Sequence, residues 1–192
     1  MSDYYFSSCD CSNENQSDFS NSNLSDFSNS NLSDFSNSNL SDFSMSNEDN
    51  FSCRDISIEE RTQLSIIENS DTICDLLSEI ARKKISLNGY SYLNLNNRCS
   101  LFNFVVGNSN KQNLREVKTV KRILDNRCVD FIESKTIRVT LPNSKSGTFA
   151  KIYCAVSENL DVFSSFFGED NSLYIETSDN CRAIKIIKSI LC

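Results

Sequence analysis

The sequence predicts an α+β fold: two ferredoxin-like βαββαβ units with antiparallel sheets, preceded by a disordered N-terminal tail. Three observations lead to this prediction. The composition changes after residue 54, from mostly Ser, Asn, Asp and Phe to continuously recurring aliphatic residues. From there, strand-like and helix-like patterns follow one another in the order βαββα(β), and this order occurs twice. We therefore divide the chain into a low-complexity tail (1–54), a first unit (55–133) and a second unit (134–192).

The tail is built from an eight-residue repeat. Ser-Asp-Phe-Ser-Asn-Ser-Asn-Leu begins at Ser17, Ser25 and Ser33, and a degraded fourth copy begins at Ser41. One Phe and one Leu in each copy bury too little apolar surface to offset an ordering entropy of about 1–2 kcal/mol per residue, so we expect disorder. Two interpretations of the repeat remain open. The Phe residues bind a partner weakly and repeatedly, or a short repeat has expanded and is tolerated because it is unfolded.

Charge and cysteine content limit the class of protein. Residues 1–54 carry nine acidic residues and one arginine, whereas residues 55–192 carry 17 acidic and 18 basic residues. The acidity therefore belongs to the tail. The nine cysteines are odd in number and mostly stand singly in apolar segments, and the N-terminus shows no signal-peptide pattern. No apolar run reaches the roughly 18–20 residues that a membrane span needs. We expect a cytoplasmic protein with reduced cysteines and no membrane partner.

The first unit begins with strand character at Arg61–Ile67, which alternates towards its end. A helix is predicted over Asp71–Lys84, with Asp71 as its N-cap and three basic residues at its C-terminal end. The remaining elements expected in this unit are strands at 85–93 and 99–106, a helix at 113–125 and a short closing strand at 129–132.

The second unit repeats this order. Its expected elements are strands at 135–141, 160–167 and 172–177 and helices at 148–158 and 180–191, with a polar loop at 142–147. The core predicted for both units comprises Leu64, Ile66, Leu77, Ile80, Phe102, Phe104, Val120, Ile137, Val139, Ile152, Val156, Leu173, Ile175, Ile184 and Ile187. The aromatic residues Phe163, Phe166, Phe167 and Tyr174 indicate either a stacking surface or, for half of them, core beneath the helices.

The stretch from Ile137 to Ile187 resembles an ACT domain of the kind paired at the end of aspartokinases. The segments that carry the resemblance are the loop ending in Gly147, the helix Phe149-Ala-Lys-Ile-Tyr153, the strands around Asn159-Leu-Asp-Val-Phe163 and Ser172-Leu-Tyr-Ile-Glu176, and the helix Arg182-Ala-Ile-Lys-Ile186. Residues 61–132 resemble a second, more diverged copy, through the order of elements alone. The resemblance implies a tandem pair of ACT-like units.

The resemblance also implies a regulatory module that binds an amino acid or similar metabolite through the loop before the first helix of a unit. A glycine there lets the backbone approach a ligand, and amides at the helix start attract a carboxylate. The ligand residues expected in the second unit are Asn143, Ser144, Lys145, Ser146, Gly147 and Thr148. Ser146 replaces the proline that is usual in the family. The first unit's loop, Glu68–Asp71, has no glycine and two acids, so no site is expected there. A second interpretation of residues 143–147 also remains open, because an ordinary loop that leads into a helix has the same composition.

Several functions are disfavoured by residues that the sequence lacks. The chain has no histidine, which removes the usual general base and nucleophile-activating partner. It shows no Gly-rich phosphate loop, paired-carboxylate motif or metal-ligand spacing, and the pair Cys9 and Cys11 has too few neighbouring ligands for zinc. We expect a non-enzyme with no catalytic residue, cofactor or metal.

Two alternatives to ligand binding remain. A degenerate ACT pair would serve as a dimerisation or protein-interaction module, since exposed strand edges pair readily with another copy and favour a homodimer. An RNA-binding ferredoxin-like domain shares the element order, but Ser172–Glu176 offers only one aromatic residue and ends in an acid. We therefore expect no nucleic-acid partner.

Overall fold

The computed structural model describes residues 56–192 except 97, 109–111, 142–146 and 192. The disorder expected for the tail and the open question of its repeat concern residues 1–54, which lie outside the described residues. Within the described part, the α+β class and the predicted element order are confirmed.

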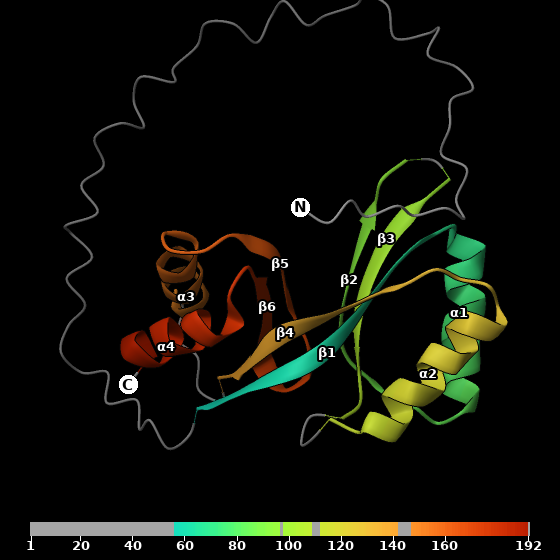
Figure 1. Ribbon diagram of the computed structural model, residues 1–192, viewed down its shortest axis with the longest axis horizontal. Helices are drawn as coiled ribbons and strands as arrows, with labels where there is room; N and C mark the ends of the chain where they lie inside the picture. The colour runs from blue at the N-terminus through green and yellow to red at the C-terminus, as the bar shows by residue number, and fades with distance from the viewer. Residues whose placement is uncertain (1–55, 97, 109–111, 142–146, 192) are drawn as a thin grey trace, which may run out of the picture. The chain divides into compact units, whose positions relative to one another are not determined.

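The described residues form ten helices and strands, joined by turns and loops (Figure 1). They are β1 (Ser57–Glu68), α1 (Ser70–Arg82), β2 (Leu87–Asn94), β3 (Ser100–Val106), α2 (Leu114–Asn126), β4 (Ile132–Thr140), α3 (Thr148–Ser157), β5 (Val162–Phe167), β6 (Ser172–Thr177) and α4 (Asn180–Leu191). A single 3₁₀ turn at Glu169–Asn171 joins β5 to β6. No helix among the described residues combines the length and apolar character that crossing a bilayer requires.

All six strands form one antiparallel sheet in the order β2-β3-β1-β4-β6-β5. The 12-residue strand β1 pairs with β4 from Ser57 to Ser65 and with β3 from Gln63 to Glu68. The sequence predicted a closing strand at 129–132 and a separate strand at 135–141, but β4 is one strand that ends the first βαββαβ run and begins the second. The boundary placed between residues 133 and 134 falls inside it.

Local capping defines where the first two helices begin. The side chain of Asn69 caps α1 by accepting a 2.9 Å hydrogen bond from the Thr72 amide, so the N-cap is Asn69 and not Asp71. The side chain of Asn113 caps α2 by accepting from the Arg115 amide at 3.1 Å. Asparagine is favoured at such positions because its side chain satisfies an amide that lacks a partner within the helix.

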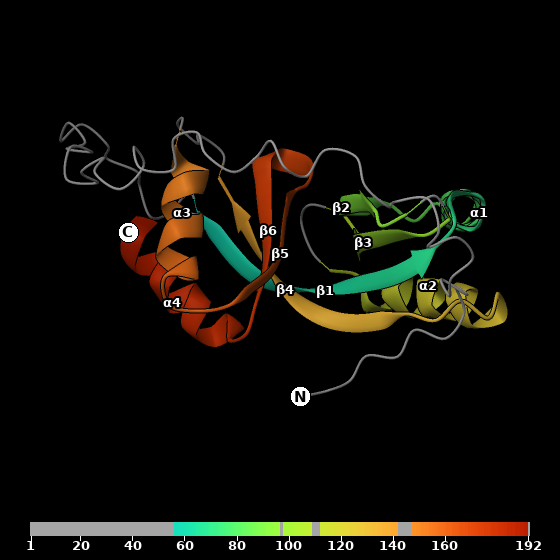
Figure 2. The same ribbon diagram turned by 90° about the horizontal axis from the view of Figure 1, so that it is seen from above.

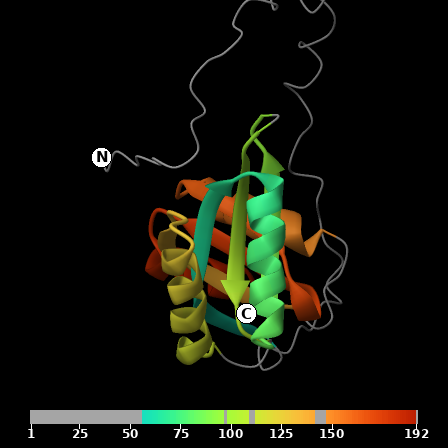
Figure 3. The same cartoon turned by 90° about the vertical axis from the view of Figure 1, so that its right-hand side faces the viewer.

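The four helices cover one face of the sheet. Alternate residues of a strand point to the same side, and the strand residues that pack against the helices are alternate ones. Leu64 and Ile66 of β1 pack beneath α1 and α2, and Ile137 and Val139 of β4 pack beneath α3 and α4. The two helix pairs lie at opposite ends of β1 and β4 (Figure 2), and α1 and α2 lie side by side (Figure 3). Of the predicted core residues, Leu77 and Ile184 are only partly buried. The others are buried as predicted.

The opposite face of the sheet is concave, because the sheet curls until its two edges meet. Gly89 of β2 forms an isolated antiparallel bridge with Gly168, the residue after β5. Beneath this contact Phe166 and Tyr174 stack with ring centroids 5.2 Å apart and pack with Val105 in a third, small cluster. The curl therefore buries side chains on the face that carries no helix.

Candidate functional site

The first candidate site is the start of α3, where the described part of the predicted ligand loop lies. Asn143, Ser144, Lys145 and Ser146 are outside the described residues, whereas Gly147 and Thr148 are within them. Gly147 is the N-cap of the ten-residue helix α3 and has φ of 88°, a left-handed conformation that favours glycine. A Cβ at Gly147 would meet no atom of the described residues within 4 Å. The backbone is therefore approachable at this point, and glycine brings no side chain to cap the helix.

Half-exposed aromatic rings lie beside this helix start. The ring centroid of Phe149 is 5.4 Å from that of Phe167 in β5 and 5.7 Å from that of Tyr153, one turn further along α3. Phe149 and Tyr153 are 37% and 38% exposed, and Phe167 is 57% exposed. A helix N-terminus attracts a carboxylate, and exposed rings offer an apolar surface. The start of α3 thus combines two features suited to a small amphipathic ligand.

The predicted aromatic group is divided by the fold. Phe163 and Phe167 are exposed, whereas Phe166 and Tyr174 are buried. Half of the group was expected in the core beneath the helices, but the pair that is buried belongs to the cluster on the concave face. The reason is strand register: Leu173 and its alternate neighbours face the helices, so Tyr174 points to the other side.

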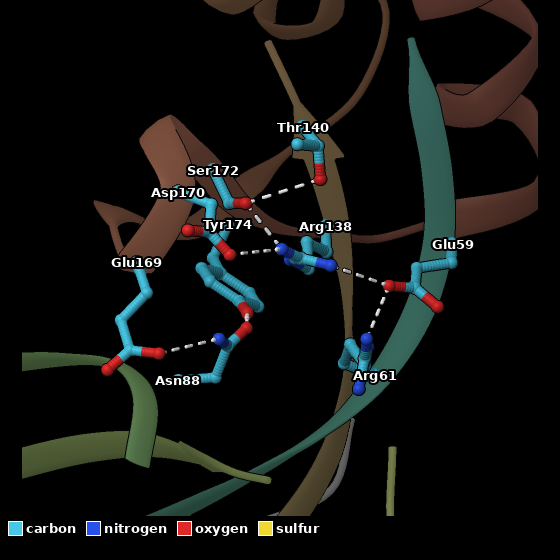
Figure 4. A network of polar contacts seen from close by, with 9 residues as sticks. All are labelled: Glu59, Arg61, Asn88, Arg138, Thr140, Glu169, Asp170, Ser172 and Tyr174. Atoms are coloured by element: carbon cyan, nitrogen blue, oxygen red, sulfur yellow. Dashed lines mark hydrogen bonds and ion pairs between the residues drawn. The ribbon is translucent and has the colours of Figure 1, made fainter. Parts of the chain in front are cut away.

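A network of polar residues, some of them buried, occupies the concave face (Figure 4). Its centre is Glu59, whose Oε1 accepts hydrogen bonds from Arg61 Nη2 at 2.5 Å and from Arg138 Nη1 at 3.0 Å. Arg61 is fully buried and Arg138 is 3% exposed. Arg138 Nε also donates to the Ser172 hydroxyl at 3.0 Å. One carboxylate therefore holds two buried guanidinium groups that come from the two central strands.

Further polar contacts lie on the same face. The hydroxyls of Thr140 and Ser172 lie 3.3 Å apart, and Asp170 lies 3.9 Å from Arg138 Nη2. In a second group of contacts, the hydroxyl of Tyr174 donates to Asn88 Oδ1 in β2, and Asn88 Nδ2 donates to Glu169 at 3.4 Å. One group is therefore centred on Arg138 of the central strand β4, and the other joins Tyr174 of β6 to the edge strand β2 (Figure 4).

Burial raises the pKa of Tyr174 to about 12, although the nearby Arg138 and Arg61 act in the opposite direction. An unfolded tyrosine ionises near pH 10, so the folded chain favours the neutral phenol. This stabilisation is fully present below pH 10 and is lost as the pH rises towards 12. It amounts to roughly 2–3 kcal/mol for a shift from 10.0 to about 12.

Tyr174→Phe removes the ionisable group and should therefore flatten the alkaline fall in stability. The free energy of unfolding of wild type and variant is measured by denaturant titration between pH 9 and 12. We expect the wild type to lose about 2–3 kcal/mol more than the variant over this interval. The comparison uses the slope of the free energy of unfolding against pH, so the pH-independent cost of losing the hydrogen bond to Asn88 does not affect it. Parallel curves would show that Tyr174 ionises as readily in the folded chain as in the unfolded one.

Sequence reasoning missed the concave-face network. Arg138 stands between Ile137 and Val139, whereas Arg61 stands in the polar stretch Glu59–Gln63, and both patterns are typical of residues that face solvent. The two arginines are buried because β2 and the turn after β5 close over them, a contact between Gly89 and Gly168 that no local pattern predicts.

The described residues hold no group of three or more Cys, Asp or Glu side chains placed to bind a metal ion. The four exposed cysteines among them, Cys74, Cys128, Cys154 and Cys181, come from four different segments. The groups that the two candidate sites do offer are backbone amides with aromatic rings at α3, and guanidinium groups on the concave face.

Comparison with solved structures identifies proteins of similar fold. Protein BT0572 from Bacteroides thetaiotaomicron aligns with a TM-score of 0.56 and 19% identity, over 69% of this chain and 89% of that one. The aspartokinase alpha and beta subunits align with a TM-score of 0.51 and 13% identity, over 70% and 95%. The ligand-free regulatory subunit of aspartate kinase from Thermus thermophilus aligns with a TM-score of 0.49 and 10% identity, over 70% of this chain and 95% of that one. No family model and no curated protein matches the sequence. The first two similarities show a fold shared with protein BT0572 and with an aspartokinase subunit.

Proposed function

We propose that the folded unit is a non-catalytic regulatory module that binds an amino acid, or a similar small carboxylate, at the start of α3. The observation that carries the proposal is Gly147: a left-handed glycine with open space above it, at the beginning of a ten-residue helix. Amides at a helix N-terminus bind carboxylates, because the helix dipole is positive there. The sequence resemblance to an ACT domain and the fold shared with an aspartokinase subunit support a regulatory role.

The ligand-binding residues proposed are those of the predicted loop, Asn143 to Thr148. In the proposed complex the ligand carboxylate lies at the amides that begin α3, and Lys145 adds positive charge. The rings of Phe149 and Phe167, whose centroids are 5.4 Å apart, support an apolar side chain on the ligand.

A thermal-shift screen of the full chain against the twenty amino acids tests the proposal. A ligand at about 100 times its Kd adds about 2.7 kcal/mol to the free energy of unfolding, which raises Tm by several degrees. We expect one selective hit, and Gly147→Val should abolish that rise because a branched side chain blocks the approach. Gly107→Val is the matched control. Gly107 also has a positive φ, of 121°, but it follows β3 and is not part of the proposed ligand loop. It should lower Tm and keep the ligand-induced rise.

The second candidate function is that of a protein-interaction module that forms a homodimer. The observation that favours it is the edge strand β2, whose residues Tyr90, Tyr92 and Leu93 are 62%, 50% and 58% exposed. The strand carries no charge, so pairing with a second copy about a twofold axis brings no like charges together. A chain that is dimeric in sedimentation velocity and gives no hit in the screen would favour this function over ligand binding.

A further inference from the structure

The two edges of the curled sheet meet through one small contact. Gly89 and Gly168 form an isolated bridge, whereas neighbouring strands elsewhere in the sheet pair through ladders of several residue pairs. A Cβ on Gly168 would lie 2.6 Å from the Tyr174 ring and 3.0 Å from the Gly89 Cα. A Cβ on Gly89 would lie 2.8 Å from the same ring. Closure therefore requires glycine on both sides.

Little apolar surface holds this contact closed. The cluster beneath it contains three buried residues, Val105, Phe166 and Tyr174, whereas the two clusters beneath the helices contain 13 and nine. Because hydrophobic stabilisation is proportional to the area removed from water, apolar burial stabilises the concave side less than either helix-covered core.

Unpaired polar atoms on the concave side favour opening further. Gln63 Oε1, Ser134 Oγ and Thr136 Oγ1 are buried without a hydrogen-bond partner among the described residues, and opening would hydrate them.

We propose that β2 and the turn after β5 form a latch. The latch opens locally, while the two helix-covered cores remain folded, and the open form exposes the concave face with Arg61 and Arg138. The contact between Gly89 and Gly168 and the hydrogen bond from Tyr174 to Asn88 hold the closed form. The latch is independent of the ligand site proposed at α3, and it makes the folded unit a switch between a closed and an open concave face.

Hydrogen exchange of the full chain, followed by mass spectrometry, tests the latch with Gly168→Ala. Gly168 has φ of −125°, which alanine adopts readily, so the added methyl group acts only through its collision with β2 and Tyr174. We expect the amides of Leu87–Asn94 to exchange on the order of tenfold faster or more, with α1 and α4 unchanged. Gly147→Ala is the control: it adds the same methyl group where no atom of the described residues lies within 4 Å, so its cost is the backbone strain of alanine at φ of 88°, and β2 should keep its wild-type rates.

Tyr174→Phe provides a second test that adds no atoms. It removes the hydrogen bond to Asn88 and keeps the ring that stacks on Phe166, so β2 should again exchange faster while the helices do not. Either a uniform rise in exchange over all elements or unchanged rates in β2 would overturn the latch. Should Gly168→Ala fail to fold, the Tyr174→Phe result decides alone.

Discussion

Glu59→Gln is expected to destabilise the folded unit by about 3–5 kcal/mol. Glu59 Oε1 lies 2.5 Å from Arg61 Nη2 and 3.0 Å from Arg138 Nη1, and both guanidinium groups are buried. Glutamine keeps the shape of the side chain and loses its charge. The two arginines would then face each other in a poorly solvated place without the carboxylate that now attracts both, and such a loss is among the costly changes in a folded protein.

Urea denaturation followed by far-ultraviolet circular dichroism measures this effect, with Glu60→Gln as the matched control. Glu60 is the next residue of β1, receives the same substitution and is exposed on the opposite face of the strand. Its replacement should change the free energy of unfolding by no more than about 0.5 kcal/mol. Equal effects at the two positions would contradict the role assigned to the Glu59 carboxylate between the arginines.

Sequence periodicity predicted the helices and strands well, because each pattern is local. The strand at 172–177 and the helix at 180–191 have the predicted bounds, and most other bounds differ by a few residues. Periodicity did not show that β4 serves both halves of the sheet. That property depends on pairing with β1, where Ser57 lies opposite Thr140, and no local pattern encodes contacts between residues so distant in sequence.

Of the two candidate sites, the sequence pointed to the one at α3 and not to the one on the concave face. Gly147 was predicted as a ligand residue because glycine lets the backbone come close to a ligand; it has φ of 88°, a conformation that favours glycine, and its role in binding stays a prediction. Gly168 carries no such signal: its φ is −125°, and only the close approach of β2 demands glycine there. The burial of Arg61 and Arg138 depends on the same approach, so the concave-face network could not be predicted from the sequence.

Ile152→Ala is expected to cost about 2–5 kcal/mol, the range for large-to-small changes in a core. Ile152 is fully buried on α3 and belongs to the cluster that includes Val139, Leu173 and Ile187. Alanine leaves a cavity there that the surrounding helices and strands fill only partly. Because β1 and β4 belong to both halves of the sheet, the loss should lower a single unfolding transition of the whole unit and should not unfold the second half alone.

Guanidinium denaturation of Ile152→Ala and of the control Ile184→Ala measures both the size of this loss and its cooperativity. Ile184 is only partly buried in the same cluster, so its replacement should cost less than that of Ile152. Hydrogen exchange in α1, at the far end of β1, reports whether the first half loses protection at the same denaturant concentration as α3. Two separate transitions would mean that the shared strands do not couple the halves, whereas one transition would show that the two ferredoxin-like runs fold as one unit.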